Sequence, residues 1–475
     1  MAGPWRTFAM VSMGVFAASL DLFVVNIAMP DLARDFSSGG LSQLSWVLNG
    51  YAIVYAALLV PAGRLVDLYG RRRGFVVGMA LFTLASAAAA LAPSVALLIV
   101  ARLVQGAGAA ILTPSSLGVV LPAFPPAARS AVIAAWAATG AVGAAAGPPL
   151  GGLLTQVSWR WIFLVNVPLG VLSAVYAAVR LPETRDPQAK GVPDLIGIVA
   201  VMGGIAAAVL ALVKGRDWGW TSGQVLSWFA VAAVMLAIAV FRSTRHAVPA
   251  IELPMLKVPS FALAVASATA FFAGFAGMLL GGVLYLTQVW GQSILRAGFE
   301  LAVGPLMAMA AATLASRIGP RYGMANLGAI GGVLLAAGIA LNAARLGLTP
   351  DYVSTYLPGQ ILTGTGVGLS LPAFTSVAVN AVHATRFATA IGLSSAFRQI
   401  GSALGVAAFV ALVGSPDRAD AISAYRTGWT FMIVTALIGA ALMLATRFAP
   451  TPLATSGAPA RTPARDAEPA PESAP

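Results

Sequence analysis

The chain has 475 residues, of which 59% are hydrophobic and 9% are charged, and its net charge is +12. Soluble domains contain roughly 45–50% apolar and about 25% charged residues, so this chain has too little charge to solvate a globule of its size. Composition therefore argues against a soluble enzyme, a disordered chain and a nucleic-acid-binding domain, and it predicts an all-α polytopic membrane protein.

Fourteen apolar segments are long enough to cross a bilayer, because a hydrocarbon core of ~30 Å requires about 20 helical residues. Their windows are 7–29, 43–65, 74–92, 94–120, 130–154, 161–179, 194–213, 221–241, 260–287, 297–316, 324–343, 352–379, 385–413 and 427–447. No connection between them is long enough for a folded soluble domain.

The two ends of the chain differ in character. Residues 1–8 carry one charge, Arg6, and lead into an apolar segment that contains Asp21 and no clear cleavage site, so we expect a first span rather than a cleaved signal peptide. Residues 449–475 are rich in Pro, Ala, Ser and Thr, and we expect a disordered cytoplasmic tail.

The basic residues predict the topology. If the N-terminus is inside, most of the 28 Lys and Arg residues fall in segments on the side of both termini. This bias is the one expected for a plasma-membrane protein with an even number of spans and both termini in the cytoplasm, and it explains the positive charge without nucleic acid.

The chain lacks the residues that several kinds of chemistry require. The chain has no cysteine and only two histidines, His246 and His383, so we expect no disulfide and no metal site. Its 16 acidic residues are scattered, and no Gly-x-x-x-x-Gly-Lys-[Ser/Thr] loop for ATP is present. We therefore expect a protein that is not an enzyme, that needs no cofactor, and whose energy source is a gradient.

A weak internal repeat has an offset of 258 residues. The matched positions in two consecutive spans are Gly106 with Gly364, Gly108 with Gly366, Pro114 with Pro372, Gly143 with Gly401, and Gly147 with Gly405. This repeat predicts two six-helix bundles, at 1–180 and 260–448, joined by a two-helix insert at 181–259. Related halves of this kind predict a binding site between them.

Four motifs in chain order resemble the major facilitator superfamily, and specifically its fourteen-span drug:proton antiporters. They are LDLFVVNIAMP at 20–30, GRLVDLYGRRR at 63–73, RLVQGAG at 102–108, and Gly140 followed by GPPLGG at 147–152. The sequence WRWIFLVNVP at 159–168 also resembles this branch. In the second half, the counterpart of the loop motif (316–321) has Ser in place of Asp67.

Asp21 is the only carboxylate well inside a predicted span, so it is a functional candidate. Arg102 lies at a similar depth, ~12–14 Å from the outer face at ~1.5 Å per residue. We expect the pair to couple transport to protons, with Asp21 holding or releasing a proton as Arg102 moves. The alternative is a structural ion pair that locks the first and fourth spans together.

The loop after the second span is a candidate cytoplasmic gate. It contains Gly63, Asp67, Gly70, Arg71 and Arg72. We expect Asp67 to accept hydrogen bonds from a helix N-terminus of the other half when the cytoplasmic side is closed. The alternative is a basic loop that only sets the topology.

The fifth span resembles the antiporter motif of the family. Its residues are Gly140, Gly143, Gly147, Pro148, Gly151 and Gly152. Glycines four residues apart on one helix face allow close packing in lipid, and Pro148 bends the helix. Tight packing alone is the alternative to a role specific to antiport.

A mostly apolar cavity between the halves would need a few polar groups. The candidates are Asn26, Tyr55, Gln105, Thr113, Gln288, Gln360, Ser370 and Arg398. Each could instead form a hydrogen bond between helices, and we favour a structural role for Arg398. Trp136 and Trp290 are equally compatible with packing or with anchoring at the interface.

The resemblance implies a proton-coupled exporter of amphipathic small molecules that works by alternating access. Its expected partners are substrate, protons and lipid, and we expect a monomer. The alternatives are a dedicated exporter of one endogenous metabolite or lipid, a membrane enzyme, and a sensor that does not transport.

Overall fold

The computed structural model describes residues 3–36, 40–125, 128–185, 191–345, 347–382, 387–414, 416–417 and 420–450. Every regular element in these residues is a helix, which confirms the predicted all-α class. The predicted tail beyond residue 450, and His383, lie outside the described residues.

The helices are α1 (Pro4–Asp35), α2 (Gly40–Tyr69), α3 (Arg71–Ala90), α4 (Val95–Val120), η1 (Leu121–Ala123), α5 (Arg129–Leu154), α6 (Trp161–Leu164), α7 (Asn166–Arg180), α8 (Leu195–Trp218), α9 (Gly223–Arg245), α10 (Leu253–Leu256), α11 (Pro259–Leu284), η3 (Tyr285–Val289), α12 (Ile294–Leu301), α13 (Val303–Tyr322), α14 (Met324–Arg345), η4 (Tyr352–Tyr356), α15 (Leu357–Asn380), α16 (Phe387–Val413) and α17 (Ala421–Ala445).

The number of spans is twelve in the described residues, or thirteen if the bent helix α2 is included. Helix α2 bends by 53° near Pro61. The predicted span at 130–154 corresponds to α5. Only its part Val142–Leu154 counts as an apolar helix, and this part is too short to be counted among the spans. The prediction of fourteen spans is therefore not confirmed.

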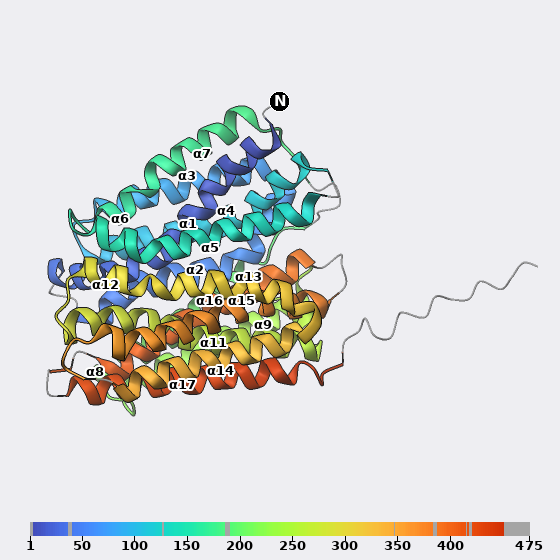
Figure 1. The fold of residues 1–475 in the computed structure, drawn as a ribbon. Coiled ribbons are helices and arrows are strands. Elements are labelled where there is room, and N and C mark those ends of the chain that lie inside the picture. Colours follow the sequence, from blue (N-terminus) through green and yellow to red (C-terminus); the bar gives the residue numbers. More distant parts are fainter. Residues whose placement is uncertain are drawn as a thin grey trace, which may run out of the picture.

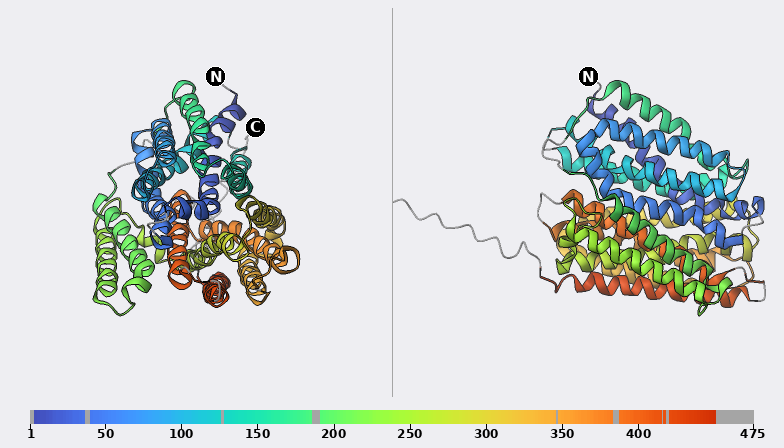
Figure 2. Two further views of the ribbon diagram at one scale, coloured as in Figure 1. Left: turned by 90° about the vertical axis from the view of Figure 1, so that its left-hand side faces the viewer. Right: turned by 180° about the vertical axis from the view of Figure 1, so that it is seen from behind.

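The helices form two groups (Figure 1). Helices α1–α7 pack mainly on one another, and α11–α17 do the same. The insert forms a hairpin, α8 and α9, that stands to one side of both groups in Figure 2. Helix α8 packs against α2 and α16, so the insert contacts both groups.

The ends of the hairpin are held by a buried carboxylate. Asp194, directly before α8, accepts hydrogen bonds from Arg242 Nε and Nη2 at 3.2 and 2.8 Å. These bonds lower the pKa of Asp194, and its backbone N–H donates to Val248 O at 3.0 Å. The hairpin is therefore clasped where its two helices meet the connecting segments.

Equivalent glycine contacts relate the two groups. A Cβ atom on Gly108 would lie 2.9 Å from Gly78 O, and one on Gly78 would lie 2.8 Å from Leu112 N. The same contacts recur between Gly366 and Gly331, and between Gly331 and Ser370. The offset is 258 residues for α4 and α15, as the sequence indicated, but 253 for α3 and α14.

The second offset corrects the alignment of the loop motif. Gly70 and Gly323 both have positive φ, at 125° and 81°, and they directly precede α3 and α14, respectively. Aligning these glycines places Pro320, not Ser316, opposite Asp67. With either alignment, the second half has no acidic residue at the position of Asp67.

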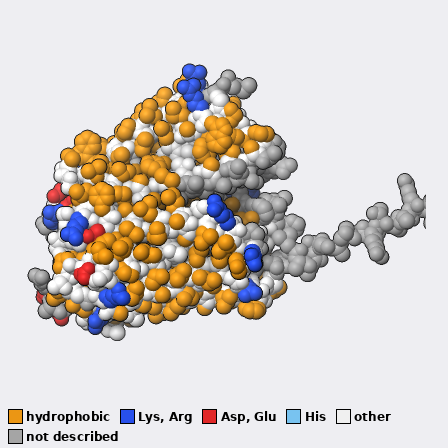
Figure 3. Space-filling model, in the orientation of Figure 1, with side chains coloured by type: hydrophobic (Ala, Val, Ile, Leu, Met, Phe, Trp, Pro, Cys, Tyr) orange, Lys and Arg blue, Asp and Glu red, His pale blue; other side chains and the backbone are white. Residues whose placement is uncertain are grey.

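The two groups meet at one end of the molecule and separate at the other. We call the end where α1 begins and α17 finishes the tail end, and the opposite end the far end. At the far end a Cβ atom on Gly298 of α12 would lie 2.6 Å from Pro148 O of α5. Figure 3 shows the surface hollowed between the groups at the tail end, so this conformation is open on the side of the termini.

The glycine crossing of α14 and α15 predicts a stability effect. Gly366→Ala would place Cβ 2.6 Å from Leu335 N, and overpacking of this kind costs about 1–3 kcal/mol. We expect a lower thermal midpoint, measured by tryptophan fluorescence in detergent. The control is Gly223→Ala, because no atom lies within 4 Å of the added Cβ there and alanine favours the helix. Equal thermal midpoints for the two variants would contradict the close contact of α14 with α15 at Gly366.

Candidate functional site

Asp21 lies fully buried in the interior of the first helix group. Its Oδ1 accepts hydrogen bonds from Gln105 Nε2 at 2.9 Å and from Asn166 Nδ2 at 3.1 Å. Its Oδ2 forms an ion pair with Arg102 Nη1. Three helices, α1, α4 and α7, therefore converge on one carboxylate.

Arg102 is as buried as its partner, with 1% of its surface exposed. Its Nε donates to Val47 O at 2.9 Å, and its Nη1 also donates to Gln105 Oε1 at 2.7 Å. Its guanidinium lies over the ring of Tyr51, 4.3 Å from the centroid. A buried pair of charges is tolerated only when such hydrogen bonds replace lost hydration, and removing one partner leaves a costly uncompensated charge.

A stack of two tyrosines links this pair to the boundary between the groups. The rings of Tyr51 and Tyr55 stack with centroids 6.0 Å apart. The Tyr55 hydroxyl lies 3.1 Å from Thr113 Oγ1, and helix α2, which carries both tyrosines, packs against α16 of the second group, which carries Arg398. The stack thus extends from the buried ion pair toward the boundary with α16.

The boundary beside Arg398 is aromatic. The Arg398 guanidinium lies 5.7 Å from the centroid of Phe272, and Arg398 Nη2 donates to Ser395 Oγ at 2.6 Å. Phe23 of α1 approaches Phe275 of α11, with centroids 6.3 Å apart. These side chains are half-buried, so they form a surface of aromatic rings and one cation between the two groups.

Four other cavity candidates make structural contacts. Asn26 Nδ2 donates to Leu22 O of its own helix, Gln105 belongs to the Asp21 network, and Ser370 Oγ donates to Gly328 O. Gln360 Oε1 accepts from Gly304 N at 3.0 Å.

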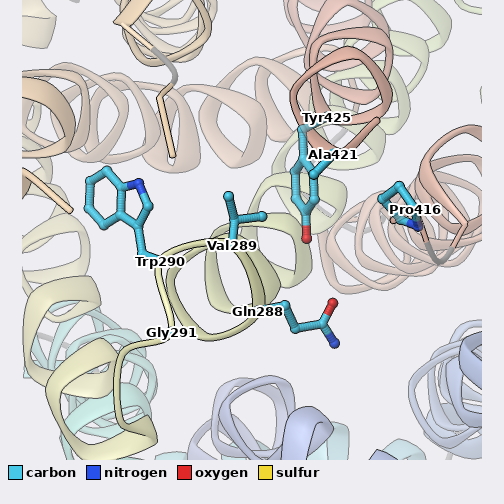
Figure 4. A pocket seen from close by; sticks show the side chains of 7 residues that line it. All are labelled: Gln288, Val289, Trp290, Gly291, Pro416, Ala421 and Tyr425. Carbon is cyan, nitrogen blue, oxygen red and sulfur yellow. The ribbon is translucent and has the colours of Figure 1, made fainter. Parts of the chain in front are cut away.

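Gln288, Trp290 and Trp136 also make contacts of their own. Gln288 lines a separate pocket of about 230 Å³ with Trp290 and Tyr425 at the far end (Figure 4). Trp290 Nε1 donates to Gly347 O, and Trp136 Nε1 donates to Ser116 Oγ. Of the predicted cavity residues, Tyr55 and Thr113 contact each other on the first group, and Arg398 lies beside Phe272 on the second.

The loop motif is held by a residue that the sequence did not single out. Glu183 Oε1 and Oε2 accept hydrogen bonds from the backbone N–H groups of Arg72 and Arg73 at 3.0 and 3.2 Å. Asp67 Oδ1 accepts from Arg71 Nε at 3.0 Å. The motif is therefore attached to the segment after α7 in this conformation, and Asp67 bonds within its own loop.

The glycines of α5 pack against α1. Cβ atoms on Gly143 and Gly147 would lie 2.6 Å from Phe16 O and from Phe23 Cβ, respectively. Gly140 and Gly151 face Ser19 and Ile27 of the same helix. Gly152 instead faces Leu295 of α12, so the motif helix contacts both groups.

Asn166 and Glu183 differ in how far the sequence could have revealed them. Asn166 belongs to the segment 159–168 that resembles the family, so a signal for it existed. Glu183 lies 111 residues from Arg72, beyond the reach of any local spacing rule.

Comparison with known proteins identifies relatives along most of the chain. The family profile described as Major Facilitator Superfamily matches residues 11–406. The multidrug resistance protein Stp of Mycobacterium tuberculosis is 37% identical, over 84% of this chain and 74% of that protein. The tetracenomycin C resistance and export protein of Streptomyces glaucescens is 33% identical, over 87% of this chain and 76% of that protein. The methylenomycin A resistance protein of Streptomyces coelicolor is 33% identical, over 88% of each chain.

Solved structures share the fold. A D-xylose–proton symporter aligns with a TM-score of 0.65 at 15% identity, over 94% of this chain and 97% of that one. A POT family transporter in complex with a thioalcohol-conjugated peptide aligns with a TM-score of 0.66 at 15% identity, over 93% of this chain and 96% of that one. At this identity the likeness concerns the arrangement of helices alone.

The buried ion pair predicts strong energetic coupling between its partners. We expect Arg102→Gln to lower the thermal midpoint more than the double variant Asp21→Asn/Arg102→Gln, because the single change leaves a buried carboxylate without its cation, at a cost of about 3–5 kcal/mol.

A surface ion pair provides the control for this comparison of single and double variants. Lys214 and Asp217 lie 3.0 Å apart, and both are partly exposed, so their coupling should be about 0–1 kcal/mol. Additive effects of the two changes at Asp21 and Arg102 would show that the two side chains do not act as a pair.

Proposed function

The chain belongs to the Major Facilitator Superfamily, and from this premise we propose that it exports amphipathic small molecules in exchange for protons by alternating access. Membership makes it a multi-pass membrane transporter rather than an enzyme. The names of its relatives as multidrug and antibiotic resistance proteins support drug efflux. The exchange for protons rests on one observation, the fully buried Asp21 paired with Arg102.

In the proposed cycle, substrate enters from the tail end, which the charge bias predicts to be cytoplasmic. The aromatic rings of Phe23, Phe272 and Phe275 offer it a stacking surface. Arg398 adds one cation, whose described partner is the Ser395 hydroxyl rather than a carboxylate. This surface favours neutral or anionic aromatic molecules over multivalent cations.

Proton exchange would act on the charge of the buried network. A proton on Asp21 neutralises the carboxylate and weakens its attraction to Arg102. Arg102 stacks on Tyr51, and Tyr51 stacks on Tyr55, so a shift of the guanidinium is transmitted to the aromatic boundary. Substrate bound near Arg398 and a proton bound at Asp21 would thereby influence each other.

Closure of the tail end would bring the loop motif to the second group. In the present open state Asp67 bonds to Arg71 of its own loop. We propose that Asp67 exchanges this partner for a helix N-terminus of the second group when the tail end closes. The glycines of α5 would then let the far end separate.

A dedicated exporter of one metabolite is the second candidate. It is favoured by the relatives named for a single compound, tetracenomycin C or methylenomycin A. Transport of one compound only, out of a panel of lipophilic cations, neutral drugs and anions, would favour it over multidrug efflux.

Proteoliposomes with an imposed pH gradient test the proposed exchange. We expect Asp21→Asn to abolish substrate-driven proton release, because an amide cannot titrate, while the thermal midpoint shows a folded protein. The control is Asp217→Asn at the partly exposed surface pair, which should release protons as the unchanged chain does. Undiminished proton release in Asp21→Asn would refute the role of Asp21.

The aromatic boundary predicts substrate preference. We expect Arg398→Gln to weaken transport of anionic aromatic substrates by about tenfold, because a charge-assisted hydrogen bond is lost, and to leave neutral ones nearly unchanged. Initial rates measured for matched anionic and neutral dyes check this. A uniform loss for both dyes would instead assign Arg398 a structural role.

A further inference from the structure

The far end of the second helix group contains a pocket of about 230 Å³ (Figure 4). It lies between the end of η3 and the start of α17, and its lining consists of Gln288, Val289, Trp290, Gly291, Pro416, Ala421 and Tyr425. Sites for drug-sized molecules have volumes of about 300–1,000 Å³. This pocket therefore has room for part of such a molecule, such as one ring with its polar substituent.

Tyr425 provides a free hydroxyl in this pocket. The residue is only 2% exposed, and no hydrogen bond from a described residue acts on its hydroxyl. The hydroxyl of Tyr51 is sealed from solvent, whereas that of Tyr425 is not. Figure 4 shows it directed toward the same space as the Gln288 amide. A hydroxyl can both donate and accept, so a ligand in the pocket can bond to it in either way.

Two neighbouring aromatic side chains have their polar atoms satisfied by the protein. The Tyr285 hydroxyl donates to Gly347 O at 2.8 Å, and Trp290 Nε1 donates to the same oxygen at 2.9 Å. Tyr425 packs against Tyr285 with ring centroids 5.5 Å apart, so it belongs to the same cluster. The Tyr425 hydroxyl differs from these two because it faces the pocket instead of a protein acceptor.

A π-helical turn presents the second polar side chain, Gln288. The turn η3 closes with a hydrogen bond from Trp290 N to Tyr285 O at 3.1 Å. Single π-helical turns are rare and frequently lie at functional sites. Gly291 follows with a φ of +66°, and a Cβ atom added there would meet no atom within 4 Å. The pocket is therefore open beside Gly291.

The two helix ends at the pocket have opposite polarity. Ala421 begins α17, and Val289 ends η3. The first N–H groups and the last carbonyl groups of a helix have no partner within it, so they add donors on one side and acceptors on the other. The described lining contains no charged side chain. These features suit a neutral ligand that both donates and accepts hydrogen bonds.

We propose that this pocket binds a neutral ring that carries a hydroxyl, carbonyl or amide group, and that it is an exit-side subsite for the exported molecule. The Tyr425 hydroxyl and the Gln288 amide bond to the polar group, and the apolar side chains of Val289, Pro416 and Ala421 contact the ring. The exit side rests on the proposed function, in which substrate leaves at the far end.

Saturation-transfer NMR on the purified full-length chain tests the binding. The probes are 4-hydroxybenzamide, which is neutral, and 4-hydroxybenzoate, which has the same ring with a negative charge. We expect saturable binding of 4-hydroxybenzamide and weaker binding of 4-hydroxybenzoate. Tyr425→Phe should weaken binding of 4-hydroxybenzamide by about fivefold, because it removes one neutral hydrogen bond and keeps the ring.

Two further variants separate the pocket from its surroundings. Tyr285→Phe removes the same atom from a ring whose hydroxyl bonds to Gly347 O and does not line the pocket, so binding should not change. Ala421→Leu puts a larger side chain into the pocket and should abolish binding. Thermal midpoints close to that of the unchanged chain show that the variants fold. Equal losses in Tyr425→Phe and Tyr285→Phe, no saturable binding, or tighter binding of 4-hydroxybenzoate would overturn the assignment.

Export by proteoliposomes tests the exit-side role separately. We expect Tyr425→Phe to slow the initial export of a neutral dye with a phenolic hydroxyl by about threefold, because the dye loses one hydrogen bond, and Tyr285→Phe to leave it unchanged. Weaker probe binding with unchanged export in Tyr425→Phe would show that the pocket lies off the exit route and would overturn the subsite. Probe binding needs no gradient, so Asp21→Asn should retain it whether or not the proposed proton exchange is correct.

Discussion

A carboxylate within the hydrocarbon core must be paired or protonated, and the rest of the structure is arranged around that constraint. Asp21 is fully buried, and it is compensated by one cation and two amide donors from α4 and α7. Charge in this setting is costly without such partners. The helix group around Asp21 is therefore held together by one buried ion pair and its amide donors.

The two helix groups share a backbone plan but differ in chemistry. Gly143 of α5 faces Phe16 O and Gly401 of α16 faces Thr269 O, which gives an offset of 253 residues for α1 and α11. At the positions equivalent to Asp21, Arg102 and Gln105, the second group therefore has Gly274, Gln360 and Thr363. Gln360 bonds to the backbone of α13 instead of to an acid. The buried ion-pair network therefore belongs to the first group, whereas the second contributes Arg398 to the aromatic boundary.

The sequence predicted the elements that depend on local patterns. Long apolar segments predicted the helices, and counting residues from the membrane face placed Asp21 and Arg102 at one depth, where the structure pairs them. Spacing alone could not show which way a polar side chain turns, so Gln105 and Gln360 were assigned to a cavity although they brace helices. Glu183 and Gly298 act across long sequence separations, and only the fold reveals them.

The central claim is that substrate binding changes the protonation of Asp21. The most direct measurement is calorimetry of one transported drug binding to the purified protein, in buffers of different ionisation enthalpy, which counts the protons released per drug bound. The account predicts release of protons by the unchanged chain and none by Asp21→Asn, with binding retained. Equal release by both proteins would place the titrating group elsewhere and contradict it.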